Sequence, residues 1–470
     1  MMKNKAMRCV WLVCGLLMLA VTSCKDDLLY TDGEPIPEGE TTIIAQVDFR
    51  PLVEGLAGKS RTAGDAIKSI QDLCVLLYDT EGNFVEGHSL ESISNANPTD
   101  GQFYVNEVTR KDGDAPDGGT IAETKTPQAN LKLTIPYGRY YIYAVANMGE
   151  DFKKAVQAHG KENGAAEEVA KYKTAIATKE GLKSISLTWD VADVAKNSQM
   201  FGHFTIVGQE NNSELITINK KGMKLHSWIR RAASKVTIAY DGSKLEEGVF
   251  IYLKSVTIKD IPQNCCLGQD NPAVPENYQP KDRDEGVKLD LIKNGETIKY
   301  YEGDTEPTIS DFKETYEARI TKGKPLFGSK EQGENAYHPK KLADVHTEIT
   351  NALYFYENMQ GKGKEGTPSD KRQVVANTLN KTEPTYPNGG QENNEAWKDA
   401  KPYGTYIEVD AFYVSINDKK VGRGPIKYRF MLGKDVITDY NAERNHHYKL
   451  TLKFKGYAND ADWHIEYEEP

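Results

Sequence analysis

Residues 131–147 read LKLTIPYGRYYIYAVAN, and this stretch decides the fold class. Two runs rich in β-branched and aromatic residues, 131–135 and 139–147, stand on either side of Pro136-Tyr137-Gly138. Proline fixes φ at one corner of a turn and glycine accepts a positive φ, so Pro-x-Gly between two such runs is turn chemistry. The stretch therefore predicts two strands joined by a tight turn.

The rest of the chain repeats this pattern of short apolar runs separated by turn signals. Residues 43–49 alternate between apolar and polar side chains, which predicts a half-buried strand, and 70–78 are more continuously apolar. Helical sequence is confined to 151–179 and a short segment at 311–320, and long polar loops are expected at 260–284 and 360–401. Further strands are predicted at 184–189, 215–219, 234–240, 250–258, 352–356, 404–415, 426–432, 448–454 and 463–467.

Many strands with few helices predict an all-β fold built of β-sandwiches, with minor helices and long loops. The chain is long enough for more than one such domain. The loop at 197–202 and the polar stretch before Trp228 indicate a boundary near Leu225. We therefore expect an N-terminal domain over 42–225 and a C-terminal domain over 226–470.

The N-terminus has the pattern of a secretory signal. A basic start precedes a short apolar run from Cys9 to Val21, which is shorter than the about 20 residues that span a bilayer. The run ends in Val21-Thr22-Ser23-Cys24, which resembles a bacterial lipoprotein box, and this resemblance implies cleavage of residues 1–23 and lipidation of Cys24. The alternative is a single N-terminal membrane anchor. Residues 24–41 are acidic and rich in Pro and Gly, so we expect a flexible tether.

Composition and motifs exclude several classes of function. The formal net charge is −10, which disfavours nucleic acid as a partner. No phosphate-binding loop, His-Glu-x-x-His or Gly-x-Ser-x-Gly motif occurs, so no enzyme, metal or cofactor is predicted. Residues 112–123 imitate a calcium loop, but Asp117 stands where glycine is needed. The alternatives for Cys265-Cys266 are buried thiols, a strained bridge or a metal, and Trp189, Trp228 and Trp463 are predicted core residues rather than sugar platforms.

Several segments together resemble the fimbrillins, the type V pilins. Tyr141 to Asn147 after Pro136-Tyr137-Gly138 is similar to their "P-x-G-x-Y…VAN" strand, and Gln199-Met200-Phe201-Gly202 is similar to their "PMFG" element, with Gln in place of Pro. The family's "R-x-A-x-K-V" strand resembles Ile229 to Val236. Residues 353–361, 428–433 and 441–448 look like a fimbrillin-like subgroup of Bacteroidales type. The matches cover nearly the whole mature chain.

This resemblance implies two transthyretin-like β-sandwich domains and a pilus subunit that is not an enzyme. In that family an arginine-specific protease removes the first strand, and a neighbouring pilin subunit fills the gap with a strand of its own. The matching cleavage position here is Arg61, followed by Thr62, in a loop of small residues. The removable strand would then carry the inward-facing positions Ile43, Ala45, Val47 and Phe49.

The resemblance also bears on location and role. It implies an outer-membrane lipoprotein at the cell surface that becomes part of a fimbrium and can meet a host or bacterial surface ligand. Only residues 457–470 follow Gly456, which is short for a donor extension and favours a tip or accessory subunit. The alternatives are an anchor subunit that keeps its first strand and a surface glycan-binding lipoprotein.

Overall fold

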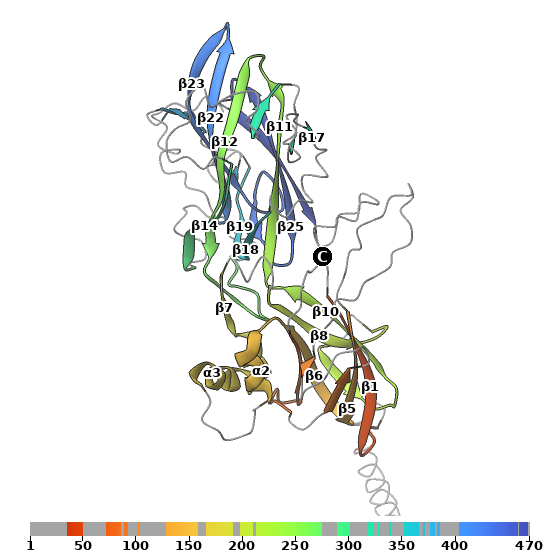
Figure 1. Ribbon diagram of the computed structural model, residues 1–470. Helices are drawn as coiled ribbons and strands as arrows, with labels where there is room; N and C mark the ends of the chain where they lie inside the picture. The colour runs from red at the N-terminus through yellow and green to blue at the C-terminus, as the bar shows by residue number, and fades with distance from the viewer. Residues whose placement is uncertain are drawn as a thin grey trace, which may run out of the picture.

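The protein is an elongated molecule of two β-sandwich domains stacked end to end (Figure 1). Predominance of strands over helices confirms the predicted all-β sandwich fold. None of the described helices is long and apolar enough to cross a membrane. The computed structural model describes residues 35–49, 72–85, 89–92, 102–103, 128–157, 166–190, 198–209, 213–274, 289–300, 318–322, 328–329, 338–339, 352–365, 370–371, 377–380, 383–385, 404–458 and 460–468.

One continuous nine-stranded sheet forms the N-terminal domain, in the order β3-β5-β1-β10-β8-β6-β2-β4, with β9 also paired to β6. β8 pairs with both β10 and β6 and so connects the two halves of the sheet, which face each other. Side chains from β1 and β5 on one half share one core with side chains from β2 and β6 on the other. The strands are β1 (Glu40–Phe49), β2 (Leu73–Tyr78), β3 (Ser89–Ser92), β4 (Gln102–Phe103), β5 (Gln128–Pro136), β6 (Gly138–Ala146), β8 (Met200–Ile206), β9 (Leu215–Ile218) and β10 (Lys224–Arg231).

The turn at Pro136-Tyr137-Gly138 leads from one half of this sheet to the other. β5 pairs with β1 and β3, whereas β6 pairs with β2, β8 and β9. The Tyr140 hydroxyl folds back to donate to the Pro136 carbonyl at 3.1 Å. A Cβ on Gly138 would lie 2.7 Å from that hydroxyl oxygen, so a larger residue at this corner would have to displace the Tyr140 side chain.

Three helices cover the outer face of β2 and β6: α2 (Gly149–Gln157), α3 (Glu167–Ile176) and α4 (Lys179–Lys183). β2 therefore packs on the sandwich core through one face and on helices through the other, and every one of its residues is buried. This explains its unbroken apolar sequence. The single helix predicted over 151–179 is divided among these elements.

Two facing sheets form the C-terminal domain, in the orders β18-β11-β25-β26 and β14-β12-β22-β23, with β15 paired to β12. A second large apolar core lies between them. The strands are β11 (Ala233–Leu245), β12 (Val249–Pro262), β14 (Leu291–Lys299), β15 (Arg319–Thr321), β18 (Ala352–Tyr356), β22 (Tyr406–Asn417), β23 (Lys420–Met431), β25 (His447–Gly456) and β26 (Asp460–Glu468). Short pairs are β16 (Gly328–Ser329) with β17 (His338–Pro339), β19 (Asn358–Lys362) with β24 (Asp439–Ala442), and β20 (Asn377–Asn380) with β21 (Glu383–Thr385).

The two domains share structure at their junction. The predicted boundary at 225/226 falls inside β10, which pairs with β1 and β8 on either side of that point. The chain leaves the N-terminal sheet only at Ala232, between β10 and β11. A two-stranded pair of β7 (Ser186–Thr188) and β13 (Asn264–Cys266) also bridges the domains. The topology therefore favours a boundary at Ala232.

Candidate functional site

The strand β1 lies in the interior of the N-terminal sheet, although it is the first strand of the chain. It pairs antiparallel with β5 at nine positions, from Glu40 to Asp48, and parallel with β10 at six positions, from Ile44 to Phe49. Both of its backbone edges are therefore hydrogen-bonded over most of its length. Figure 1 shows β1 among the strands of the N-terminal domain, near β5 and β10.

The inward face of β1 is part of the hydrophobic core. Ile43 and Val47 have no exposed surface, and Ala45 is 1% exposed. All three pack in the cluster that also holds side chains from β2, β5 and β6. Phe49 occupies the last position of the strand, where its backbone pairs with Ile229. The outward side chain of Ile44 is 42% exposed.

The processing residues predicted from the sequence lie outside the described residues. This holds for the lipidation position Cys24, for Arg61 and Thr62, and for the calcium-loop imitation at 112–123. Arg61 falls in the connection between β1 and β2, which belong to different halves of the sheet. A cut there would leave β1 joined to the domain only by non-covalent contacts.

The C-terminal strand β26 is paired within its own domain. It runs antiparallel to β25, with nine register pairs from Lys455–Asp460 to His447–Glu468. Ala461 and Ile465 are buried against the C-terminal core. On the far side β26 has no strand partner among the described strands. The strand thus completes an edge of its own sheet in this structure.

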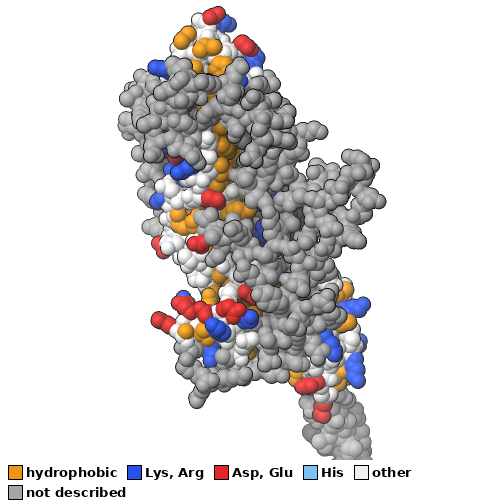
Figure 2. Space-filling model, in the orientation of Figure 1, with side chains coloured by type: hydrophobic (Ala, Val, Ile, Leu, Met, Phe, Trp, Pro, Cys, Tyr) orange, Lys and Arg blue, Asp and Glu red, His pale blue; other side chains and the backbone are white. Residues whose placement is uncertain are grey.

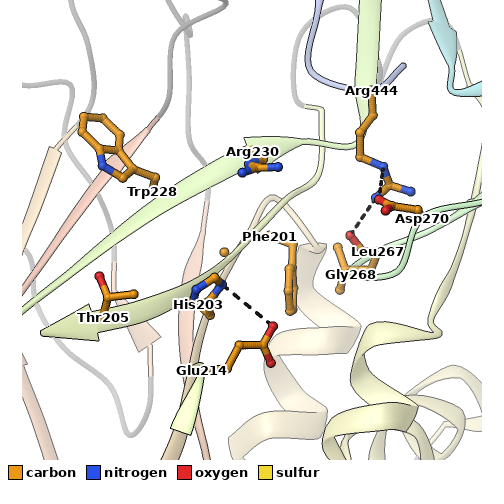
Figure 3. A pocket seen from close by; sticks show the side chains of 11 residues that line it. Phe201, His203, Thr205, Glu214, Trp228, Arg230, Leu267, Gly268, Asp270 and Arg444 are labelled. Atoms are coloured by element: carbon orange, nitrogen blue, oxygen red, sulfur yellow. Dashed lines mark hydrogen bonds and ion pairs between the residues drawn. The ribbon is translucent and has the colours of Figure 1, made fainter. Parts of the chain in front are cut away.

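A pocket of about 380 Å³ lies at the domain junction, on the outer face of β8 and β10 (Figure 3). Phe201 forms its inner wall, stacked on Tyr143 with ring centroids 5.2 Å apart. A Cβ on Gly268 would lie 2.8 Å from that Phe201 ring, so the glycine lets the C-terminal domain approach it closely. The residues that line the pocket are Phe201, Gly202, His203, Thr205, Glu214, Trp228, Arg230, Leu267, Gly268, Asp270 and Arg444.

Glu214 is the central acidic group of this pocket. Its Oε2 accepts hydrogen bonds from Lys183 at 2.6 Å and from the Tyr143 hydroxyl at 2.9 Å, while Oε1 lies 4.0 Å from His203 Nδ1. Burial by itself raises the pKa of Glu214, but the hydrogen bond and charge of Lys183 outweigh it and lower that pKa. Burial lowers the pKa of His203. At neutral pH the pocket thus holds a carboxylate beside a neutral imidazole.

Trp228, at the rim of the pocket, is not in the core as the sequence predicted. Trp228, predicted as a core residue, is 47% exposed on the outer face of β10. Leu225 and Ile229 take the inward positions of that strand, so Trp228 faces solvent with His226 and Arg230. Trp189 is half-buried between the domains, and the side chain of Trp463 lies outside the described residues.

Metal and thiol chemistry find no support in the part of the chain that the structure describes. No group of three or more His, Cys, Asp or Glu side chains there could hold a metal ion. Cys74, Cys265 and Cys266 are free thiols. Burial raises the pKa of Cys74 and of Cys265 well above the usual thiol range, which makes both unreactive.

One family model matches a part of the chain. A family model described as a domain of unknown function (DUF4906) matches residues 353–452, from β18 into β25. No curated protein matches the chain.

Several solved structures are similar over almost the whole chain. A candidate cell adhesion protein of Parabacteroides distasonis is 10% identical, with a TM-score of 0.42, over 92% of this chain and 98% of that one. The tip fimbrial protein Mfa3 of Porphyromonas gingivalis is 10% identical, with a TM-score of 0.36, over 92% and 100%. A fimbrilin of the same organism is 11% identical, with a TM-score of 0.38, over 91% and 97%.

Proposed function

We propose that the protein is a fimbrial subunit that is exported as a lipoprotein, cleaved after Arg61 and assembled by exchange of β1 for a strand of a neighbouring subunit. One observation carries this proposal: the first strand of the chain fills an interior position of its sheet, between β5 and β10. Only the connection through Arg61 ties it covalently to the rest of the domain. Its role is structural, with no catalytic step.

Loss of β1 would leave a long slot with two kinds of unsatisfied surface. Burial of a valine or isoleucine side chain is worth about 1.5–3 kcal/mol, so exposing the pockets of Ile43 and Val47 would cost several kcal/mol. The facing edges of β5 and β10 would also lose their backbone partners over the positions that β1 now pairs. A strand from another subunit repairs both losses at once.

The slot also restricts which strand can enter. Ala45 is 1% exposed at the middle of the inward face, so a donor must present a small residue there. The apolar positions of β26 are Ala461, Trp463, Ile465 and Tyr467. Aligning its single small residue with Ala45 would place Trp463 at the pocket of Ile43 or Val47. This mismatch, together with the pairing of β26 to β25, favours a tip or accessory subunit that accepts a strand without donating one.

The partners follow from this sequence of events. Cys24 would hold the precursor to the outer membrane through its acyl chains until an arginine-specific protease reaches the loop after β1. The released subunit would then join other pilin subunits in a fimbrium at the cell surface. An anchor subunit would keep both its lipid and its first strand.

The decisive experiment replaces Arg61. We expect the wild-type protein in purified fimbriae to begin at Thr62, and the Arg61→Ala variant to keep its acylated Cys24 and stay out of fimbriae. Lys59→Ala is the matched control, because it removes a basic residue from the same loop; its N-terminus should equal that of the wild type. N-terminal sequencing and mass spectrometry of fimbriae and membranes provide the readout. Wild-type fimbriae containing a chain that starts at Cys24 would overturn the proposal.

A further inference from the structure

The junction pocket has the size and composition of a binding site for a small ligand. Its volume of about 380 Å³ falls in the range of 300–1,000 Å³ that is typical of such sites. Aromatic and charged side chains from both domains line it, with Trp228 set apart from Phe201 and Glu214 at one side (Figure 3). The proposed strand exchange uses none of these side chains, so it does not explain why they lie together in a pocket.

Trp228 gives the pocket an apolar platform in a fixed orientation. The His226 ring meets the indole edge-to-face, with centroids 4.7 Å apart and planes at 76°. The indole is nevertheless 47% exposed. A large aromatic side chain held in place but open to water is typical of a surface that binds a ligand with a flat apolar face.

Arg230 adds a cation on the same face of β10. Its side chain is exposed, and no hydrogen bond or ion pair engages its guanidinium within the described part of the chain. Arg444, by contrast, is held by Glu357 and by the carbonyls of Cys266 and Gln269. An unengaged guanidinium is suited to a carboxylate, which it can bind with two parallel hydrogen bonds.

Acceptors for hydroxyl groups complete the pocket. Glu214 Oε2 is used by Lys183 and Tyr143, whereas Oε1 faces His203 and has no hydrogen-bond partner in the described residues. Asp270 is 91% exposed at the opposite wall, where it lies 4.0 Å from Arg444. Both carboxylates can accept hydrogen bonds from hydroxyl donors.

From these features we infer that the junction pocket binds a saccharide that carries a carboxylate, of the uronic or sialic acid type. The C–H face of the sugar ring stacks on the Trp228 indole. The Arg230 guanidinium pairs with the sugar carboxylate. Glu214 and Asp270 accept sugar hydroxyl groups. A neutral sugar satisfies the indole and the carboxylates but leaves Arg230 unused, so the carboxylate sets the preference.

Titration of the full chain with defined sugars tests this inference. The probes are glucuronic acid and N-acetylneuraminic acid, with glucose and N-acetylglucosamine as neutral counterparts, followed by saturation-transfer NMR and calorimetry. We expect the acidic sugars to bind at least about tenfold more tightly than the neutral ones, which corresponds to about 1.4 kcal/mol. Trp228→Ala should weaken binding of all the sugars about tenfold or more.

Arg230→Gln tests whether the sugar carboxylate is recognised by Arg230. This variant should abolish the preference for acidic over neutral sugars. Lys224→Gln is the matched control: Lys224 is another exposed cation on the outer face of β10 but does not line the pocket, and its loss should leave every affinity unchanged. Circular dichroism checks that each variant is folded. Three results would overturn the inference: no sugar binding by the wild type, equal affinity for acidic and neutral sugars, or binding of a polyglutamate peptide in preference to sugars.

Discussion

Glu408 shows how a single buried charge can be stabilised in a sandwich of this kind. Its side chain is 3% exposed on β22, yet three cations surround it: Lys259 at 2.7 Å, Arg429 at 2.8 Å and Lys427 at 3.1 Å. Burial by itself raises the pKa of Glu408, but the hydrogen bonds from Lys259, Arg429 and Lys427 outweigh it and lower that pKa to about 2. The ionised form is therefore the one that the folded protein prefers.

We predict that Glu408→Gln destabilises the protein in a pH-dependent way. At pH 7 the loss should be about 3–5 kcal/mol, because three cations lose a buried partner. Since the folded pKa lies below the unfolded one, this stabilisation is present above pH 4.5 and lost as the pH falls toward 2. The difference in unfolding free energy between variant and wild type, measured in urea, should shrink over that window.

The matched control is Asp410→Asn on the same strand. Asp410 is 40% exposed and lies 3.3 Å from Lys427, so its loss should cost less than about 1 kcal/mol. An equal loss for both variants, or a loss for Glu408→Gln that does not change with pH, would contradict the argument.

At the scale of single elements, the sequence predicted β1 well and β10 poorly, for a physical reason. From Ile43 to Val47 the inward positions of β1 are apolar, so alternation alone reveals its buried face there. On β10 the inward positions are Leu225, Ser227 and Ile229, and the fully buried serine interrupts the apolar pattern. The only signal that Trp228 faces outward was its polar neighbours two residues away on either side.

The neighbours of each strand could not be predicted in the same way. Alternation says which face of β1 is buried but does not say that β5 and β10 flank it. Its register partners are 80–96 residues away on β5 and 180 residues away on β10. The junction pocket could not be predicted from the sequence for the same reason. Its walls come from β8, β10 and the segments around Gly268 and Arg444, which only the folded domains bring together.

The role of β26 can be tested by fixing it to β25. Lys449 and Glu466 are register partners on the two strands, so the double variant Lys449→Cys, Glu466→Cys can form a cross-strand disulfide. For a tip or accessory subunit, we predict that the oxidised variant enters fimbriae as efficiently as the wild type. A subunit that donates β26 would instead be blocked when oxidised and would assemble again after reduction. Fimbrial yield with and without reductant distinguishes the two.

At the scale of the whole molecule, the two domains are joined by a packed interface rather than by a linker alone. One apolar cluster contains Phe152 and Leu187 from the N-terminal domain together with Cys265, Leu267 and Tyr356 from the C-terminal domain. Figure 2 shows exposed apolar side chains at the end of the C-terminal domain that lies away from the junction. Ile416 and Val421 are exposed there, as a register pair of the β22–β23 hairpin. A rigid junction would keep the N-terminal domain and this hairpin at a fixed separation.

Buried polar contacts hold together the C-terminal domain's side of the junction. Arg444 donates to Glu357 and to the carbonyls of Cys266, Leu267 and Gln269, and Glu357 also accepts from the backbone of Asn271. Glu357 is 3% exposed, so its charge is compensated by these groups rather than by water. The segment after β13 is thereby fixed to the loops that flank β18 and β25.

We predict that Glu357→Gln lowers the unfolding free energy by about 3–5 kcal/mol, because it leaves the guanidinium of Arg444 buried without its charge partner. Asp270→Asn is the matched control on the same arginine: Asp270 is 91% exposed and 4.0 Å away, and its loss should cost under about 1 kcal/mol. Calorimetry provides a second readout, since domains that share a core should still unfold in one transition at a lower temperature. Two separate transitions in the wild type would mean that the domains fold independently and that the interface contributes little to either.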